Sequence, residues 1–331
     1  IEEECKDREE IDISEIEAMV FDKLITKKQR LTARAYEGYR STREFQRENE
    51  NTVDTEISEL LSGTSDYWKN ENSNKNPRLN TTQRDYLAGI VSTDAARRYI
   101  LPPEIVQADA DGIIHVHDKD YLIQFMTNCC LINLDDMLQN GTVISETLIE
   151  KPHSFSTACT VATQIIAQVA SGQYGGQSIN GIDRILAPFV RKSYEKILNN
   201  VIEEQVEIYG MEPNMEKARE IAWKRTRKEV KDGIQTIQYQ INTLMTTNGQ
   251  SPFVTLFMYF KPDYEYAKEA ALITEEILCQ RIKGVKNEAD VYITPAFPKL
   301  IYVLDEHNVT PDSPYYYLTE LAAQCTAKRM Y

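Results

Sequence analysis

Long apolar runs are missing from this sequence, which contains no stretch of about 18 apolar residues, the length that a membrane-spanning helix needs. The first residues also lack the pattern of a signal peptide. Positive charge is scarce as well, because 37 lysines and arginines face 51 aspartates and glutamates, which gives a net charge of −14. This balance argues against non-specific binding to nucleic acid or to an anionic membrane, while a local site can still be basic enough for a small anion.

Paired cysteines are also absent, since none of the six cysteines belongs to a C-x-x-C pair. This usage indicates neither a zinc ribbon nor a disulfide framework and fits a reducing cytoplasm. We assign no residue of the chain as a metal ligand. The run SGQYGGQSINGIDR, residues 171–184, has neither the lysine of a P-loop nor the G-x-G-x-x-G pattern. It favours a helix end and a turn in which glycines permit positive φ, and an anion site at the helix start near Asp183 is the alternative.

The chain length of 331 residues favours about two domains. Ser14 and Glu17 form a capping box ahead of an apolar helical face, and a second helix is expected over 31–46. From residue 47 to about 82 the sequence is rich in Asn, Glu and Ser, which suggests a loop-rich connection. We therefore divide the chain into a small helical unit, a linker and a larger unit, over 1–47, 48–85 and 86–331.

The larger unit alternates short apolar runs with longer helical patterns. Strands are expected over 113–116, 130–134, 253–259 and 300–304. Helices are expected over 157–171, 183–199 and 216–246. Strands separated by helices predict an α/β fold with a parallel sheet or a barrel.

His115 and His117 are the first candidate functional residues in this unit. They are two residues apart at the expected strand over 113–116, so their side chains would point to one face, as in an H-x-H metal pair. The spacing names no third ligand. The alternatives are two polar residues at the end of a strand, or one histidine that hydrogen-bonds a substrate.

Cys129 and Cys130 are the second candidates. In a strand, neighbouring side chains alternate, so the two thiols would point to opposite faces and only one could face a given pocket. A cysteine in a strand is usually a small apolar residue. The neighbouring Asn128 and the upstream histidines favour a functional thiol here.

Two proline-containing turns precede apolar strands, TNGQSPFVT at 247–255 and TPAFPKL at 294–300. Their composition is typical of turns. The alternative is that both line a pocket in which Lys299 meets a phosphate or a carboxylate.

Several segments together resemble the anaerobic (class III) ribonucleoside-triphosphate reductases. They cover residues 111–331 nearly continuously and include HVHDKDY, TNCCLINLDDML, SGQYGGQSINGID, TTNGQSPFVT, AFPKLIYVLDE and CTAKRMY. The segment over 13–47, which ends in AYEGYRSTREFQR, is similar to the second half of an ATP-cone, a nucleotide-binding regulatory module.

This resemblance implies a ten-stranded α/β barrel of the glycyl-radical enzyme type, with its N-terminal half in this chain and a small helical ATP-cone remnant ahead of it. The implied activity is reduction of ribonucleoside triphosphates to deoxyribonucleoside triphosphates by glycyl and thiyl radicals, with ATP, dATP and other nucleotides as effectors. The glycyl radical and a structural zinc are expected outside this chain, which alone is therefore expected to be inactive. The expected partners are a radical-SAM activating enzyme and a second copy in a homodimer.

By the same resemblance, Cys129 matches a strand cysteine that delivers reducing chemistry to the substrate, and His117 and Asn128 match residues that bind the substrate. A thiol has a weak S–H bond, and a rigid strand suits a step that tolerates little misplacement. Asp109 stands where relatives often carry a histidine. Cys325 has the helical spacing of a buried residue and is not taken as the radical cysteine.

Two other functions compete with the reductase. One is a different glycyl-radical enzyme, a lyase of the pyruvate formate-lyase type, against which the ATP-cone remnant and the NCCLINL strand argue. The other is a regulatory and dimerisation protein that binds nucleotides and catalyses no reaction.

Overall fold

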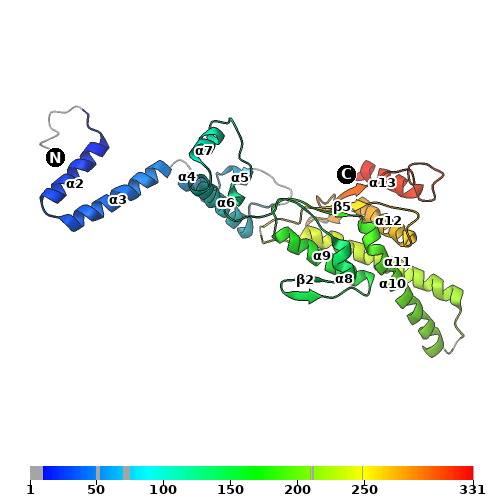
Figure 1. The fold of residues 1–331 in the computed structure, drawn as a ribbon. Coiled ribbons are helices and arrows are strands. Elements are labelled where there is room, and N and C mark those ends of the chain that lie inside the picture. Colours follow the sequence, from blue (N-terminus) through cyan, green and yellow to red (C-terminus); the bar gives the residue numbers. More distant parts are fainter. Residues whose placement is uncertain are drawn as a thin grey trace. The chain divides into compact units, whose positions relative to one another are not determined.

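The chain divides into two compact units. Figure 1 draws and labels their helices and strands. The first unit groups residues 1–70 with 86–124, and the second groups 71–85 with 125–331. The computed structural model describes residues 10–49, 53–69, 75–208, 210, 212–247 and 249–330. Cys5 and the first nine residues of the small unit predicted over 1–47 lie outside the described residues.

The two units do not follow the boundaries that we drew from the sequence. Residues 86–124 group with the N-terminal helices, and residues 71–85 group with the larger unit. Two contacts explain why residues 71–85 group with the larger unit. Lys75 forms an isolated antiparallel bridge with Gln250. The buried Thr82 hydroxyl donates to the Gly249 carbonyl oxygen over 2.8 Å.

The first unit is helical. Its helix α2 (Ile13–Thr26) begins after Asp12, whose carboxylate accepts a hydrogen bond from the Ser14 backbone over 2.8 Å, so Asp12 rather than Ser14 is the N-cap. The predicted second helix is α3 (Arg30–Asn49). The other elements are α4 (Val53–Ser62), α5 (Asp66–Lys69), α6 (Asn80–Tyr99), which begins in the second unit, α7 (Pro103–Ala110) and the 3-10 helix η1 (Lys119–Tyr121).

The loop-rich connection expected over 48–85 contains α4 and α5 instead. Residues 50–52 and 70–74 of this stretch are outside the described residues. Helix α4 buries Leu60, and the indole N–H of Trp68 donates to the Leu60 carbonyl oxygen over 2.9 Å. Since glutamate and leucine are both good helix formers, a polar composition alone did not exclude a helix.

The second unit is built on a four-stranded parallel sheet. In spatial order its strands are β1 (Cys130–Leu131), β4 (Gln177–Asn180), β5 (Val254–Met258) and β8 (Lys299–Tyr302). Two antiparallel pairs accompany it, β2 (Thr142–Ile144) with β3 (Thr147–Ile149) and β6 (Val285–Lys286) with β7 (Tyr292–Ile293). The α/β fold with a parallel sheet, predicted from the sequence, is therefore confirmed.

The helices of the second unit include the three expected from the apolar periodicity, which are α9 (Phe155–Ser171), α10 (Ile182–Glu203) and α11 (Met215–Thr243). The remaining ones are α8 (Leu134–Asn140), the π-helix η2 (Glu204–Ile208), α12 (Ala267–Lys283) and α13 (Tyr316–Arg329). Strand β4 lies inside the run 171–184, where the sequence predicted only a helix end and a turn.

The described helices cover one face of the sheet. On β5, Val254, Leu256 and Met258 are buried in the same core as α9, α10 and α12, which Figure 1 draws around this strand. Burying one such apolar side chain stabilises the fold by about 1.5–3 kcal/mol. The opposite face is open, since Leu131 and Ile301 are 81% and 40% exposed. The sheet thus has a packed face and a face that remains accessible.

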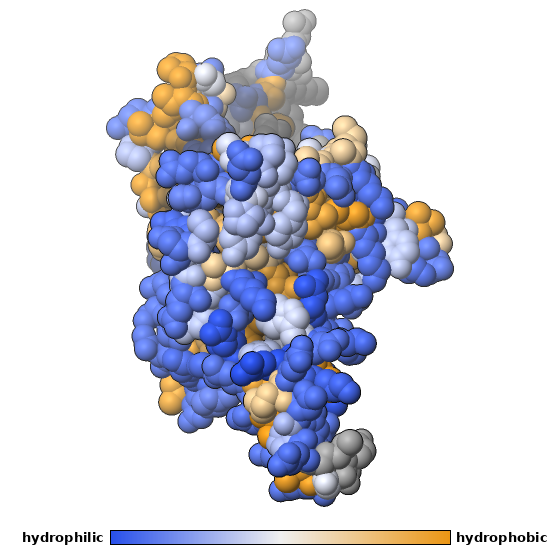
Figure 2. All heavy atoms as spheres, turned by 90° about the vertical axis from the view of Figure 1, so that its right-hand side faces the viewer, coloured by the Kyte–Doolittle hydropathy of each residue, from blue (hydrophilic) through white to orange (hydrophobic). Residues whose placement is uncertain are grey.

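None of the described helices is long and apolar enough to cross a membrane. On the face drawn in Figure 2, hydrophilic residues predominate and hydrophobic residues lie in separate patches. This surface agrees with a sequence in which 27% of the residues are charged.

Candidate active site

Asn128 and Cys129 directly precede β1 and lie between this strand and an isolated bridge at Thr127. Thr127 forms a parallel bridge with Gln173, and the Gly175 N–H donates to the Asn128 carbonyl oxygen over 2.8 Å. One step further, the Cys130 N–H donates to the Gly176 carbonyl oxygen over 3.2 Å. Backbone hydrogen bonds of the residues before and after it therefore hold Cys129 against residues 173–176.

The two neighbouring thiols lie on opposite faces of the sheet. Cys130 pairs with the buried Gln177 and packs against the hydrophobic core, and burial raises the pKa of its thiol. Cys129 is exposed, on the same side as Leu131. Of the vicinal pair, Cys129 is therefore the more exposed cysteine, and Cys130 is partly buried against the core.

A glycine approaches the exposed thiol closely. The Cys129 S–H donates to the side-chain oxygen of Asn128, with 3.1 Å between sulfur and oxygen. A Cβ on Gly175 would overlap that oxygen and would lie 3.0 Å from the Cys129 sulfur and 2.5 Å from the Asn128 carbonyl oxygen. Only glycine fits at position 175. Sequence reasoning placed this residue in a turn and missed its contact with the thiol.

The amino ends of the next strands bring aromatic and basic side chains to the same end of the sheet. A Cβ on Gly176 would lie 2.8 Å from the Phe253 ring, which packs edge-on against Phe297 with 4.8 Å between centroids. The Lys299 ammonium lies 4.8 Å from the Phe253 centroid. The turns over 247–255 and 294–300 therefore meet here through the contact between the Phe253 and Phe297 rings.

The histidine segment belongs to the first unit, whereas Asn128 and Cys129 belong to the second. The strand expected over 113–116 is wrong, because this segment has no strand structure. His115 and His117 are exposed, with 5.8 Å between ring centroids, and the His117 Nδ1 lies 2.5 Å from the Asp118 carboxylate. The H-x-H arrangement on one strand face is therefore not formed.

Asp109 explains the shape of the histidine segment. Its carboxylate accepts a hydrogen bond from the Val116 backbone over 2.9 Å and pairs with the Lys119 ammonium. These two interactions, that with Lys119 first, lower the pKa of Asp109. The aspartate that replaces the histidine expected from the resemblance thus anchors the loop. Among the described residues, no group of three or more His, Cys, Asp or Glu side chains could hold a metal ion.

The predicted anion site near Asp183 is not supported. The Asp183 side chain is buried at the start of α10, and one of its carboxylate oxygens accepts a hydrogen bond from the Tyr259 backbone over 3.2 Å. Burial raises the pKa of this carboxyl to about 6. An acidic side chain therefore occupies the helix start that an anion would use.

Comparison with known proteins adds to this geometry. A family model described as anaerobic ribonucleoside-triphosphate reductase matches residues 71–331, a range that includes His117, Asn128 and Cys129. The chain belongs to this reductase family. It is 42% identical to the anaerobic ribonucleoside-triphosphate reductase of Escherichia coli K12, over 100% of this chain and 44% of that protein. It is 39% identical to the reductase of Enterobacteria phage T4, over 85% of this chain and 44% of the phage protein.

This reductase-family chain spans less than half the length of these relatives. A solved structure, the anaerobic ribonucleotide reductase from Thermotoga maritima with dATP bound in the specificity site, aligns with a TM-score of 0.49 and 14% identity. That alignment covers 83% of this chain and 48% of the other.

Proposed function

We propose that the protein to which this chain contributes reduces ribonucleoside triphosphates to deoxyribonucleoside triphosphates, and that Cys129 delivers hydrogen to the substrate. The observation that carries the proposal is the exposure of Cys129 on the open face of the sheet, beside Gly175, while Cys130 is partly buried against the core. The family match favours this reaction over a lyase of the pyruvate formate-lyase type.

The proposed chemistry needs a thiol that is accessible and fixed. In the family, the glycyl radical supplies the unpaired electron that activates the substrate at C3′, and loss of water at C2′ creates the need for reducing hydrogen. The S–H bond of Cys129 is weak enough to give the substrate one hydrogen atom, which leaves a radical on the sulfur. A reductant, formate or a small redoxin, would supply the two electrons of the net reaction and restore the thiol. The backbone hydrogen bonds of Asn128 and Cys130 limit the positions that the sulfur can take, which suits a transfer with strict geometric demands.

Asn128 and His117 are proposed to bind the substrate. With the Asn128 side-chain oxygen accepting the Cys129 S–H, its amide nitrogen is the group that can donate to a ribose hydroxyl. With the His117 Nδ1 next to the Asp118 carboxylate, its Nε2 is the nitrogen that can meet the substrate. Both residues would therefore contribute one defined hydrogen-bonding atom.

The open face of the sheet supports the proposed architecture. Leu131, which is 81% exposed, would be covered in a ten-stranded barrel to which these four strands contribute. Helices α2 and α3 are proposed as a remnant of an ATP-cone that responds to ATP, dATP and other nucleotides. A radical-SAM activating enzyme and a second copy of the protein are the proposed partners.

Two cysteine variants of the complete reductase, activated without oxygen, test the proposal. Cys129→Ser should abolish deoxyribonucleotide formation and leave the glycyl radical visible by electron paramagnetic resonance. Cys130→Ser is the matched control and should retain activity, because this thiol packs against the core. The proposal fails if Cys130→Ser abolishes the reaction and Cys129→Ser preserves it.

A further inference from the structure

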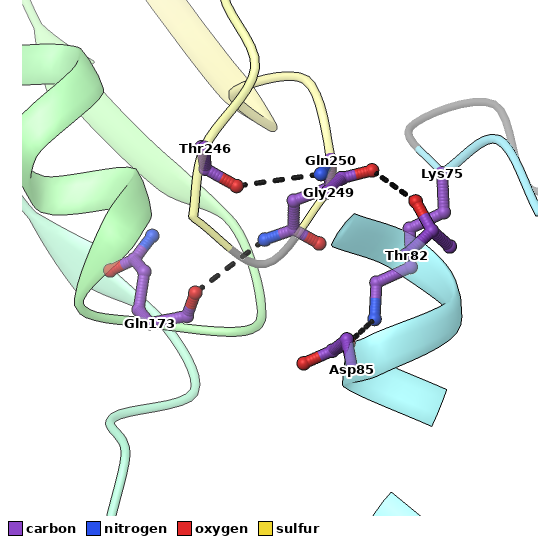
Figure 3. Close-up of polar contacts among 7 residues, drawn as sticks. All are labelled: Lys75, Thr82, Asp85, Gln173, Thr246, Gly249 and Gln250. Carbon is purple, nitrogen blue, oxygen red and sulfur yellow. Dashed lines mark hydrogen bonds and ion pairs between the residues drawn. The ribbon is translucent and has the colours of Figure 1, made fainter. Parts of the chain in front are cut away.

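A set of buried amide side chains leads from the loop before β5 toward the thiol. Gln173 and Gln250 are 1% and 2% exposed, and Thr246 next to them is 5% exposed. Figure 3 draws the outer part of this network, in which the Gln250 side chain reaches across to residue 173. Burying a primary amide costs free energy unless the amide is hydrogen-bonded. Apolar side chains of similar size would fill this space at a lower cost in free energy.

The network continues to the residues around Cys129. The Gln250 side-chain nitrogen donates to the Gln173 carbonyl oxygen over 3.5 Å, and the Gln173 side-chain nitrogen donates to the Gly175 carbonyl oxygen over 3.3 Å. The Gly175 N–H in turn donates to the Asn128 carbonyl oxygen over 2.8 Å. The two glutamines therefore hold both ends of the 173–175 turn that presses against Asn128 and Cys129.

The far end of the network is anchored as well. The Thr246 N–H donates to the Gln250 carbonyl oxygen over 2.9 Å, and the Gln250 N–H donates to the Thr246 hydroxyl over 3.4 Å. The Gly249 carbonyl oxygen between them accepts from the Thr82 hydroxyl over 2.8 Å. Gly249 has a φ of 71°, and a Cβ there would lie 2.5 Å from the Thr82 backbone nitrogen. The Lys75–Asp85 ion pair, 2.7 Å long, flanks this contact. Gly249 and Gln250 are thus fixed in place.

We infer that Gln173 and Gln250 are positioning residues. They fix the position of the Cys129 thiol by holding Gly175 against Asn128. Neither side chain is placed at the substrate. Each acts through the turn, which leaves the Asn128 oxygen where it accepts the Cys129 S–H. The geometric part of this inference stands alone, and only its effect on turnover rests on the proposed function.

The test measures the reactivity of Cys129 in the protein with Gln173→Met, which keeps the side-chain length and removes the amide. Gln173→Glu is a second variant that keeps the shape and replaces the donor by an oxygen. Iodoacetamide alkylation is followed at each cysteine by mass spectrometry, with the exposed Cys279 as internal reference. Alkylation of Cys129 relative to Cys279 should become about fivefold to tenfold faster, the factor that corresponds to one ordinary hydrogen bond.

Gln177→Met is the matched control. This glutamine is equally buried, and its side-chain nitrogen donates to the Ile166 carbonyl oxygen in α9, away from the thiol. Its alkylation ratio should stay at the parent value. An unchanged ratio in both Gln173 variants, or an equal change in the Gln177 control, overturns the inference.

Turnover of the complete reductase separates this inference from the proposed function. Gln173→Met should lower kcat about tenfold and leave KM for the nucleotide unchanged, because the substrate-binding groups remain. If the alkylation ratio changes but the parent protein has no reductase activity, the positioning role is supported and the proposed function is wrong. If kcat falls tenfold and the alkylation ratio is unchanged, the positioning role is wrong and the proposed function is supported.

Discussion

The two ends of the parallel sheet differ in what they offer a ligand. At the amino ends, Cys129 and Asn128 sit against a glycine that no other residue can replace. At the carboxyl ends of β1 and β4 lies a cavity of about 450 Å³, bordered among others by Asn133, Arg184 and Tyr264. Ligands of open parallel sheets usually bind beyond the carboxyl ends, so cavity size would favour the second place.

If Cys129 carries the proposed reaction, close backbone approach is a better guide to the site than open volume. At the amino ends, Gly175 and Gly176 bring the chain within contact of Cys129 and Phe253, and buried amides hold the turn. At the carboxyl ends, the buried Asp183 fills the start of α10 and the cavity remains open. Rigid placement is what a hydrogen transfer requires, whereas the cavity offers only room.

The largest effect is expected from a substitution at the amino ends of the strands. Gly175→Ala in the complete reductase should lower kcat by roughly 100-fold or more, because the new methyl group overlaps the Asn128 side-chain oxygen and displaces the thiol. Deoxyribonucleotide formation is the measurement. Gly172→Ala is the control, since a Cβ there meets only the Val169 carbonyl oxygen at 3.7 Å. Equal activity of the two variants would show that the close approach has no role.

A substitution at the carboxyl ends of the strands should change the folding stability rather than the turnover. Burial raises the pKa of Asp183 to about 6, so the folded state favours the protonated acid and loses stability as the pH rises from about 4 through 6. Roughly two pKa units correspond to about 2 to 3 kcal/mol at neutral pH. Asp183→Asn should remove this part of the pH dependence in chemical denaturation between pH 4 and 7. A variant with the same pH profile as the parent would contradict the assignment.

The same comparison shows what the sequence could predict. Strand β5 and the helices α9, α10 and α11 follow from apolar periodicity, because each has a buried side and a more exposed side. The separation of the Cys129 and Cys130 thiols follows from strand alternation. These features depend on local pattern, which is present in a single sequence.

Other features depend on contacts between distant residues. The strand β4 is short and polar, and its pairing with β5 between residues 177 and 254 outweighs the turn-like glycines beside it. The run 113–116 looks apolar enough for a strand, yet the Asp109 carboxylate holds the Val116 backbone in a loop. The role of Gly175 also emerges only when residues 128 and 175 are brought together.

A moderate effect on substrate binding is expected from substitution of Lys299, at the amino ends of the strands. Its ammonium is exposed on the open face above Phe253, where it could meet a substrate phosphate. Lys299→Met should raise KM for the nucleotide about fivefold to tenfold with kcat unchanged, and the difference should shrink at high salt. Lys268→Met is the control, because that lysine lies over Trp223 in another part of the unit, 3.9 Å from the ring centroid. The same rise in both variants would count against a phosphate contact.

The smallest expected effect is at Arg184, on the carboxyl-end cavity. Its guanidinium lies 5.2 Å from the Tyr259 ring centroid, so Arg184→Met should cost about 1 kcal/mol of folding stability in denaturant titrations. Steady-state kcat and KM should change less than about twofold, since the proposed thiol lies at the opposite strand ends. If Arg184→Met instead abolishes turnover while the glycyl radical persists, the substrate must reach the carboxyl ends, and the contrast between the two ends of the sheet no longer assigns the chemistry to Cys129.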